Sequence, residues 1–240
     1  MTDLYLYQTL HLQAGQPRST AAHVAVLNSA SQQLFGRAYT PDLTTLKKRI
    51  AAAARSERYP TAVSGFVRLE LTAAGEERII PAGISLYDGY ALRSLTPDAV
   101  VVQYDNPFTD APTSAREAAA QLAQRQAETA GAGVALQCDT AGVCRTADDA
   151  PLIAVRGRCL FVAPNDGTPC VERDLTLQAA RAEGLETVEE PFTVGQLACF
   201  DELFYVDHRG VTALSRCEGR PYMSLVAERL ARGVEGLFRR

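Results

Sequence analysis

Lysine is scarce in this chain of 240 residues, because Lys47 and Lys48 are the only two and every other basic side chain except histidine is an arginine. A reaction that requires a lysine amine must therefore use one of this pair. The two lysines adjoin Arg49 in a segment with a helical pattern, which is typical of a solvated helix face. We therefore expect both lysines to be exposed on a helix.

Metal-binding patterns are also missing. The histidines His11, His23 and His208 are scattered, and the six cysteines form neither a C-x-x-C pair nor a cysteine–histidine pattern at zinc spacing. We expect reduced, mostly buried cysteines and no metal site. Cys199 has no histidine nearby in the sequence, so we interpret it as an inert buried thiol rather than a nucleophile.

Long apolar runs and a strong net charge are absent. No run approaches the roughly 20 residues that span a bilayer, and the first residues lead into no apolar signal core. The net charge of -4 gives no electrostatic basis for binding nucleic acid or an anionic membrane. We therefore expect a cytoplasmic protein with neither nucleic acid nor membrane as a partner.

The chain does contain a mixture of strand and helix patterns, which predicts an α/β (α+β) fold. Strands are predicted at residues 4–12, 65–71, 78–81, 100–104, 134–138, 152–155, 159–162, 187–190, 203–206 and 211–214. Helices are predicted at 20–34, 40–55 with Thr40 as N-cap, 114–130, 172–183 and 224–238. Turn-forming residues gather at 105–112. We therefore predict a small N-terminal domain at 1–105, a linker at 106–112 and a C-terminal domain at 113–240.

Short motifs occur in order along nearly the whole chain. They are Tyr7-Gln8-Thr9-Leu10, His23 with Leu27, residues 132–136 with Asp139 and Gly142, and Asp201-Glu202-Leu203-Phe204. Together they resemble the fold-type IV pyridoxal-phosphate enzymes, which include branched-chain aminotransferases, D-amino-acid aminotransferases and 4-amino-4-deoxychorismate lyase. The resemblance implies a small N-terminal α/β domain, a larger barrel-like C-terminal domain, a cofactor cleft between them and a homodimer.

The resemblance also implies specific groups that this sequence lacks. Counting from Gly142 by the family spacing places the Schiff-base lysine at Thr113, and threonine cannot form an imine. The glutamate that pairs with the pyridine nitrogen falls on Thr146, whose hydroxyl would not hold a proton there as a carboxylate does. The helix arginine that contacts the cofactor phosphate falls on Val26.

The remaining positions implied for the phosphate are acidic or apolar. The family's G-I-T-R turn reads Cys170-Val171-Glu172-Arg173, and its late loop reads Asp207-His208-Arg209. Glu172 and Asp207 would face a dianion, which is unfavourable without a compensating cation. The positions implied for cofactor contact are thus Val26, Thr146, Val171, Glu172 and Asp207. Asp148 and Asp149 would replace the missing glutamate only if the loop shifted, so the interpretation that we favour for them is a solvated acidic turn.

The sequence leaves three interpretations of the function open, and it does not decide whether the chain is an enzyme. The favoured one is a degenerate family member, a pseudoenzyme without covalent pyridoxal phosphate. The second is an active 4-amino-4-deoxychorismate lyase or amino-acid aminotransferase with a non-standard site. The third is a binding protein, or a different enzyme, that holds a small anionic ligand in a cleft lined by Arg116, Arg145, Arg173 and His208. Each arginine is otherwise expected in a surface ion pair.

Overall fold

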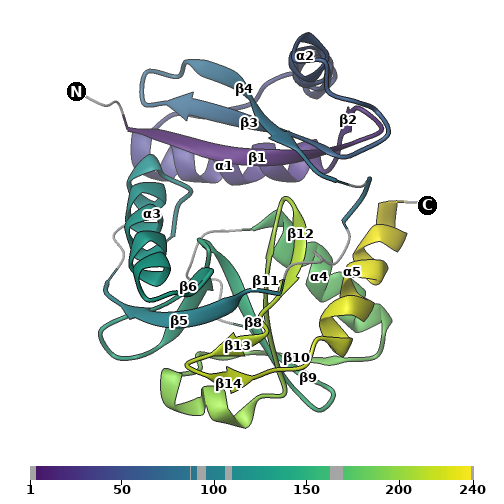
Figure 1. Cartoon of the computed structure of the whole chain (residues 1–240). Coiled ribbons are helices and arrows are strands. Elements are labelled where there is room, and N and C mark those ends of the chain that lie inside the picture. The colour runs from purple at the N-terminus through teal and green to yellow at the C-terminus, as the bar shows by residue number, and fades with distance from the viewer. Residues whose placement is uncertain (1–3, 87, 91–95, 106–109, 163–169, 239–240) are drawn as a thin grey trace. The chain divides into compact units, whose positions relative to one another are not determined.

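The structure is a computed structural model that describes residues 4–86, 88–90, 96–105, 110–162 and 170–238 (Figure 1). The chain forms two compact units. The first contains Met1–Gly89 and Asp110–Ala115, and the second contains Tyr90–Thr109 and Arg116–Arg240. Within the described residues, no helix combines the length and the apolar character needed to cross a membrane.

The first unit is an antiparallel sheet with two helices packed on one face, in the strand order β2-β1-β3-β4. Its elements are β1 (Tyr5–Gln13), β2 (Gln16–Pro17), α1 (Thr20–Phe35), α2 (Leu43–Ser56), β3 (Gly65–Thr72) and β4 (Glu77–Ile84). Alternation along β1 directs Leu6 and Leu10 into a core shared with Leu27 of α1 and Ile50 of α2. The hydrophobic effect of this one-sided core explains why the sheet and both helices form together.

Helix α2 begins later than predicted. The Asp42 side chain accepts a hydrogen bond from the N–H of Thr45 at 2.8 Å, which makes Asp42 the N-cap and Leu43 the first helical residue. The prediction of Thr40 as the cap is therefore wrong. Asp42 is the N-cap because its carboxylate reaches an otherwise unpaired backbone N–H of the first helical turn.

The second unit is built on a larger mixed sheet in the order β10-β9-β8-β7-β6-β5-β13-β14, with the β11–β12 hairpin paired to β8. The first six of its strands are β5 (Asp98–Gln103), β6 (Val134–Cys138), β7 (Cys144–Ala147), β8 (Ala150–Arg156), β9 (Cys159–Val162) and β10 (Glu186–Glu189). The others are β11 (Glu202–Asp207), β12 (Gly210–Ala213), β13 (Arg216–Cys217) and β14 (Arg220–Pro221). The α/β class predicted from the sequence is confirmed.

Helices cover this sheet at two places. Helix α3 (Ser114–Thr129) runs beside β5 and β6 in Figure 1, and its small residues Ala123 and Ala127 pack against Val102 and Ala135. Helices α4 (Val171–Ala182) and α5 (Leu225–Phe238) share a separate core with β8, β9, β11 and β12. A short 3-10 helix, η1 (Val194–Cys199), precedes β11.

The division of the chain differs from the predicted boundary at residue 105. Strand β5 pairs in parallel with β6 and with β13, so Asp98–Gln103 belongs to the second unit. Parallel neighbours need a crossover connection, and helix α3 supplies it here. Pro112 belongs instead to the first unit, where its carbonyl accepts the N–H of Tyr7 at 2.9 Å. Residues 106–109 of the predicted linker lie outside the described residues.

Four short strands escaped prediction: β2, β7, β13 and β14. Segments of two to four residues carry too little alternation to be distinguished from turns. Strand β7 is the consequential one, because it places Thr146 in a ladder opposite Gln137 rather than in a loop.

Glu202, from the motif at residues 201–204, acts as a structural cap. Its carboxylate, 1% exposed, accepts the N–H of Val226 at 2.8 Å and the N–H of Ala227 at 3.0 Å, so it closes the first turn of α5 from a strand 24 residues earlier. These contacts give Glu202 a role in the fold.

Replacing Glu202 with alanine should lower the free energy of unfolding by about 2–3 kcal/mol, because hydrogen bonds to a charged group are lost and the N–H groups of Val226, partly buried, and Ala227, buried, are left unpaired. Glu202→Gln should cost less, since an amide oxygen still accepts one bond. Urea unfolding measures both, with Glu186→Ala on the exposed side of β10 as control. Equal losses for Glu202→Ala and the control would contradict the capping role.

Candidate functional site

The position implied for the Schiff-base lysine is occupied by a buried threonine. Thr113 is 1% exposed, forms a β-bridge with Leu6, and donates its backbone N–H to the carbonyl of Ala111 at 2.9 Å. Val26 is half-buried on α1 in the same unit. Both lysines are exposed on α2, as predicted from the pattern around them.

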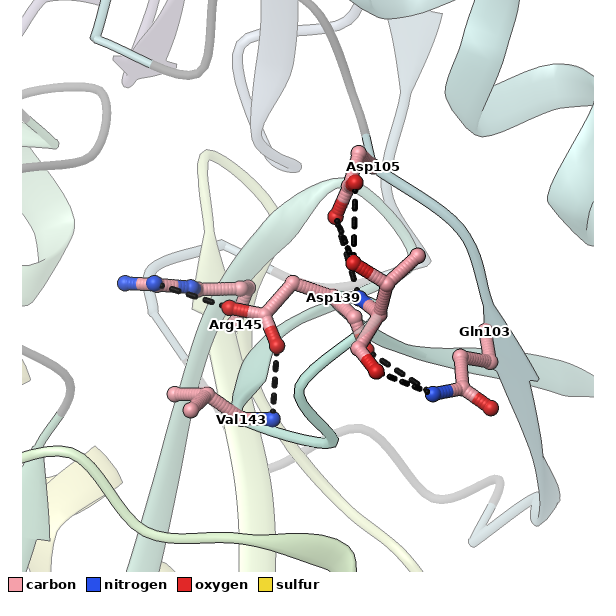
Figure 2. Close-up of polar contacts among 6 residues, drawn as sticks. Gln103, Asp105, Asp139, Val143 and Arg145 are labelled. Carbon is pink, nitrogen blue, oxygen red and sulfur yellow. Dashed lines mark hydrogen bonds and ion pairs between the residues drawn. The ribbon is translucent and has the colours of Figure 1, made fainter.

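Side-chain hydrogen bonds close the β6–β7 turn. Asp139 accepts the N–H of Val143 at 2.8 Å and a guanidinium N–H of Arg145 at 3.0 Å (Figure 2). Burial alone would raise the pKa of Asp139, but these two donors hold it below its usual value. Gly142, at φ +80°, supplies the left-handed conformation that closes the turn.

Two further side chains hold the same turn from outside it. Gln103 donates its amide N–H to the carbonyls of Asp139 and Thr140, at 3.2 and 3.0 Å. Asp105 accepts the backbone N–H of Thr140 at 3.0 Å and its hydroxyl (Figure 2). The D-x-x-G motif therefore has a structural role, and Arg145 serves the turn.

The other arginines expected to line an anion site are also paired with carboxylates. Arg116, 7% exposed, binds the Asp149 carboxylate through Nε at 2.8 Å and the Asp149 carbonyl at 2.9 Å. Arg173, 5% exposed, binds Glu189 at 2.8 Å and Asp174 at 3.4 Å. An anionic ligand would have to compete with carboxylates already in place.

Asp148 and Asp149 form the two-residue turn between β7 and β8, with φ values of +49° and +60°. Positive φ at both central residues is typical of a tight hairpin turn. The predicted turn is confirmed, and it is only partly solvated, because Asp148 pairs with Arg209 at 2.7 Å and Asp149 pairs with Arg116. Aspartate tolerates the left-handed conformation while its carboxylate reaches a cation across the unit.

Arg209 joins this turn to the β11–β12 turn. Its Nε donates to the buried Asp207 carboxylate at 2.7 Å, and its Nη2 donates to Asp148 at 2.7 Å. Burial raises the pKa of Asp207, but His208 and Arg209 beside it reverse the effect and hold that pKa below its usual value. Asp207 is therefore a carboxylate in its ionised form, neutralised by its own turn.

Glu172 lies in the first turn of α4, directly after Val171, and is 7% exposed. Its Oε2 accepts the thiol of Cys170 at 3.4 Å. Burial raises the pKa of Glu172 to about 7, the hydrogen bonds from its own N–H and Cys170 oppose the rise, and the nearby charge of Asp207 adds to it. The structure thus brings together Glu172 and Asp207, two residues far apart in the sequence.

Two residues of this region were not among the predicted site residues. The Tyr104 hydroxyl donates to Gln137 Oε1 at 3.2 Å, and burial together with the charge of Asp149 raises the pKa of Tyr104. Gln137 is 4% exposed, and its amide nitrogen has no hydrogen-bond partner among the residues that the structure describes. The available signal was one polar residue inside the otherwise apolar strand 134–138.

The cysteines offer no further chemistry of this kind. All six are free, and Cys138, Cys144 and Cys217 are buried, whereas Cys199 is exposed. The prediction of a buried thiol is wrong for Cys199, because it ends the surface helix η1. Over the described parts of the chain, no three side chains of the metal-binding types gather.

Comparisons with known proteins agree on one family. A family model described as amino-transferase class IV matches residues 5–207. No curated protein sequence gives a significant match. Among solved structures, Escherichia coli branched-chain amino acid aminotransferase is 17% identical to this chain. The match covers 98% of this chain and 85% of the Escherichia coli chain, with a TM-score of 0.81.

Two other solved structures show the same fold. A Brucella abortus aminotransferase bound to the co-factor PLP is 17% identical, with 98% and 88% of the two chains covered and a TM-score of 0.79. A protein described as a 4-amino-4-deoxychorismate lyase from Legionella pneumophila is 15% identical, with 98% and 90% covered and a TM-score of 0.80. At such identities the likeness concerns the fold alone.

Replacing Arg209 with glutamine should lower the free energy of unfolding by about 3 kcal/mol, because the buried Asp207 carboxylate loses its charged partner. Arg232→Gln is the matched control, since its pair with Glu228 is solvent-exposed and worth at most about 0.5 kcal/mol. Chemical denaturation of the two variants provides the measurement. A similar small loss in both would show that Arg209 is dispensable.

Stability should depend on pH through Glu172. Since its folded pKa is raised, the folded chain binds this proton more tightly than the unfolded chain, and stability falls as pH rises toward that pKa of about 7. The Glu172→Gln variant has no ionisable group at this position, so its free energy of unfolding does not fall in this way. The difference in free energy of unfolding between Glu172→Gln and the wild type should therefore increase in favour of the variant by roughly 2–3 kcal/mol between about pH 5 and pH 8. Urea midpoints across this range measure it. An advantage independent of pH would exclude a raised pKa.

Proposed function

The chain belongs to the class IV aminotransferase family, and we propose that it uses this fold to bind a small ligand without Schiff-base chemistry. The observation that carries the proposal is Thr113, a buried hydroxyl at the position where the resemblance implies a lysine. A hydroxyl cannot condense with an aldehyde to form an imine.

The two lysines do not supply the missing amine in this arrangement. Lys47 and Lys48 are both exposed on α2. Imine-forming lysines are activated by a desolvated pocket or by a neighbouring cation held close to the amine. A lysine on an open helix face lacks a desolvated setting, so neither is a good candidate for a reactive amine.

The charges in the second unit also fit pyridoxal phosphate poorly. The position implied for the pyridinium partner holds the hydroxyl of Thr146 on β7, not a carboxylate. The positions implied for the phosphate hold Glu172 and Asp207, and the Arg209 guanidinium is bound to Asp207 and Asp148. The residues at these positions therefore do not fit pyridoxal phosphate.

A binding role, rather than a purely structural one, is supported by Gln137. A buried amide donor without an acceptor costs about 1–3 kcal/mol, and such groups in native proteins ordinarily meet a water, an ion or a ligand. The amide oxygen of Gln137 already accepts a hydrogen bond from the Tyr104 hydroxyl. A ligand with a carbonyl or ring-nitrogen acceptor would accept a hydrogen bond from the amide nitrogen of Gln137.

The alternative is an active lyase or aminotransferase, which would need an amine from Lys47 or Lys48. We expect that one equivalent of pyridoxal phosphate, followed by borohydride, leaves most wild-type chains unmodified by intact mass. The Lys47→Arg/Lys48→Arg double variant, which keeps both positive charges, is the control. A saturable one-to-one adduct on a lysine, absent from the double variant, would overturn the proposal.

The same preparation should release no pyruvate from aminodeoxychorismate and should transfer no amino group from common amino acids when the cofactor is added. Turnover that disappears in the double lysine variant would establish the alternative, because it would show that an α2 lysine takes part in the chemistry.

A further inference from the structure

Two of the six cysteines lie directly opposite each other in the β6–β7 ladder. Cys138, the last residue of β6, and Cys144, the first residue of β7, are Cα partners in this antiparallel pair. Both are buried, with exposed fractions of 2% and 0%. Among the strands that the structure describes, no other ladder pairs two cysteines. The ladder therefore distinguishes this pair from the other thiols.

The backbone at this pair has the geometry in which antiparallel strands approach most closely. The N–H of Cys144 donates to the carbonyl of Phe192 at 2.8 Å, and the carbonyl of Cys138 accepts the N–H of Tyr104, which follows β5, at 3.0 Å. Cys138 and Cys144 are thus a non-hydrogen-bonded pair, whose Cα atoms typically lie about 4.5 Å apart. A disulfide spans Cα separations of roughly 4.4–6.8 Å, so the spacing of the ladder suits a bond.

Both thiols lie on the same face of the sheet. The register shifts between Gln137 and Cys138, yet Cys144 still packs in one core with Leu136 of β6. Leu136 and Cys138 are two residues apart on β6, so they face the same side. The Cys138 thiol donates to the carbonyl of Val102 on β5 at 3.9 Å, and a thiol is a weak donor. Turning the Cys138 sulfur toward β7 therefore needs a new χ1 rotamer and gives up little hydrogen-bond energy.

The turn between the two cysteines is already ordered. The side chains of Asp139, Gln103 and Asp105 bind its backbone N–H groups and carbonyls (Figure 2). A disulfide stabilises mainly by restricting the unfolded chain. A bond between Cys138 and Cys144 would therefore raise stability while closing a segment that is held in place without it.

Two inert buried thiols are the competing explanation. Burial raises the pKa of Cys144 to about 12 and also raises the pKa of Cys138, and the thiolate is the reactive form. However, Thr140 and Ala141 in the turn between them are exposed, which gives a small oxidant a short route to Cys138 when the turn opens. Inert thiols would stay reduced in such an oxidant, whereas a reactive pair would not.

We propose that Cys138 and Cys144 are a site of reversible oxidation, at which a small peroxide converts two thiols into a cross-strand disulfide. Cys138, beside the exposed turn, attacks one peroxide oxygen as its thiolate; the O–O bond breaks, and a sulfenic acid and one water form. The Cys144 sulfur then attacks the Cys138 sulfur, the S–O bond breaks, and a second water leaves. The two thiols lose two electrons and two protons, which the peroxide takes up.

The first experiment treats the folded wild type with hydrogen peroxide, unfolds it in excess iodoacetamide and digests it with trypsin. Cleavage after arginine leaves Cys138 and Cys144 together in peptide 126–145. We expect this peptide to lose two hydrogens and both alkylation sites, and to recover them after treatment with dithiothreitol. Peptide 159–173, which also contains two cysteines, is the internal control and should form no disulfide, because no ladder pairs its cysteines.

Two variants test the assignment of the bond. Cys138→Ser should form no disulfide in peptide 126–145. Cys199→Ser removes an exposed thiol that could exchange with the pair, and it should form the same disulfide as the wild type.

A second measurement uses the wild type alone and does not depend on a variant folding. The urea midpoint should be higher after oxidation than before it and should return to the starting value after reduction. The same peroxide treatment should produce no rise in Cys138→Ser.

Three results would overturn the proposal. The first is full alkylation of peptide 126–145 under conditions that oxidise Cys199. The second is a disulfide between Cys144 and Cys217, which shares the core of Cys144 but lies on β13, with β6 and β5 between the two strands in the sheet order. The third is a lower urea midpoint after oxidation. None of these results bears on Thr113 or the two lysines, so this inference and the proposed function stand or fall separately.

Discussion

Buried charge must be paired, and this constraint organises the second unit. Arg209 joins Asp207 at the end of β11 to Asp148 in the β7–β8 turn, and Arg116 on α3 holds the adjacent Asp149. A buried ion is stable only when a partner and further hydrogen bonds replace its lost hydration. Two short turns and the first turn of a helix are therefore held in one arrangement by alternating carboxylates and guanidinium groups. The same pairing leaves these arginines occupied, so the feature that orders the unit also limits what it can bind.

The relation between this chain and its family separates fold from chemistry. Solved aminotransferase structures share the fold at 15–17% identity, which shows how few residues the fold requires. Leucine alternation in β1, the alanines of α3 that allow close packing, and the Glu202 cap of α5 each help to position an element. None of these residues takes part in imine chemistry. A shared fold therefore does not by itself fix the chemistry, because function is carried by sites placed on folds.

Much of the fold could be predicted from the sequence, since periodicity and turn residues report local structure directly. The Asp139–Gly142 turn is an example, because its glycine and its aspartate each fulfil a local requirement. The failures have a common cause. The sequence does not place strand β5 in the second unit, because its partners are distant along the chain: Ala99 pairs with Val134, 35 residues later, and Asp98 pairs with Arg216, 118 residues later. Asp148-Asp149 was recognised as a turn but not as an ion-pair partner, because Arg116 and Arg209 approach it only in the folded unit.

The sequence by itself determined which functional groups exist. Thr113 carries a hydroxyl in any conformation, and the sequence contains lysine only at positions 47 and 48. The absence of an amine at position 113 therefore follows from the sequence alone. Only the tertiary structure decided how the remaining groups are used. It paired Arg116, Arg145 and Arg173 with carboxylates, left the Gln137 amide nitrogen without an acceptor among the described residues, and buried Glu172 beside Asp207. Covalent identity is a local property, whereas burial and charge pairing depend on residues that meet only when the chain has folded.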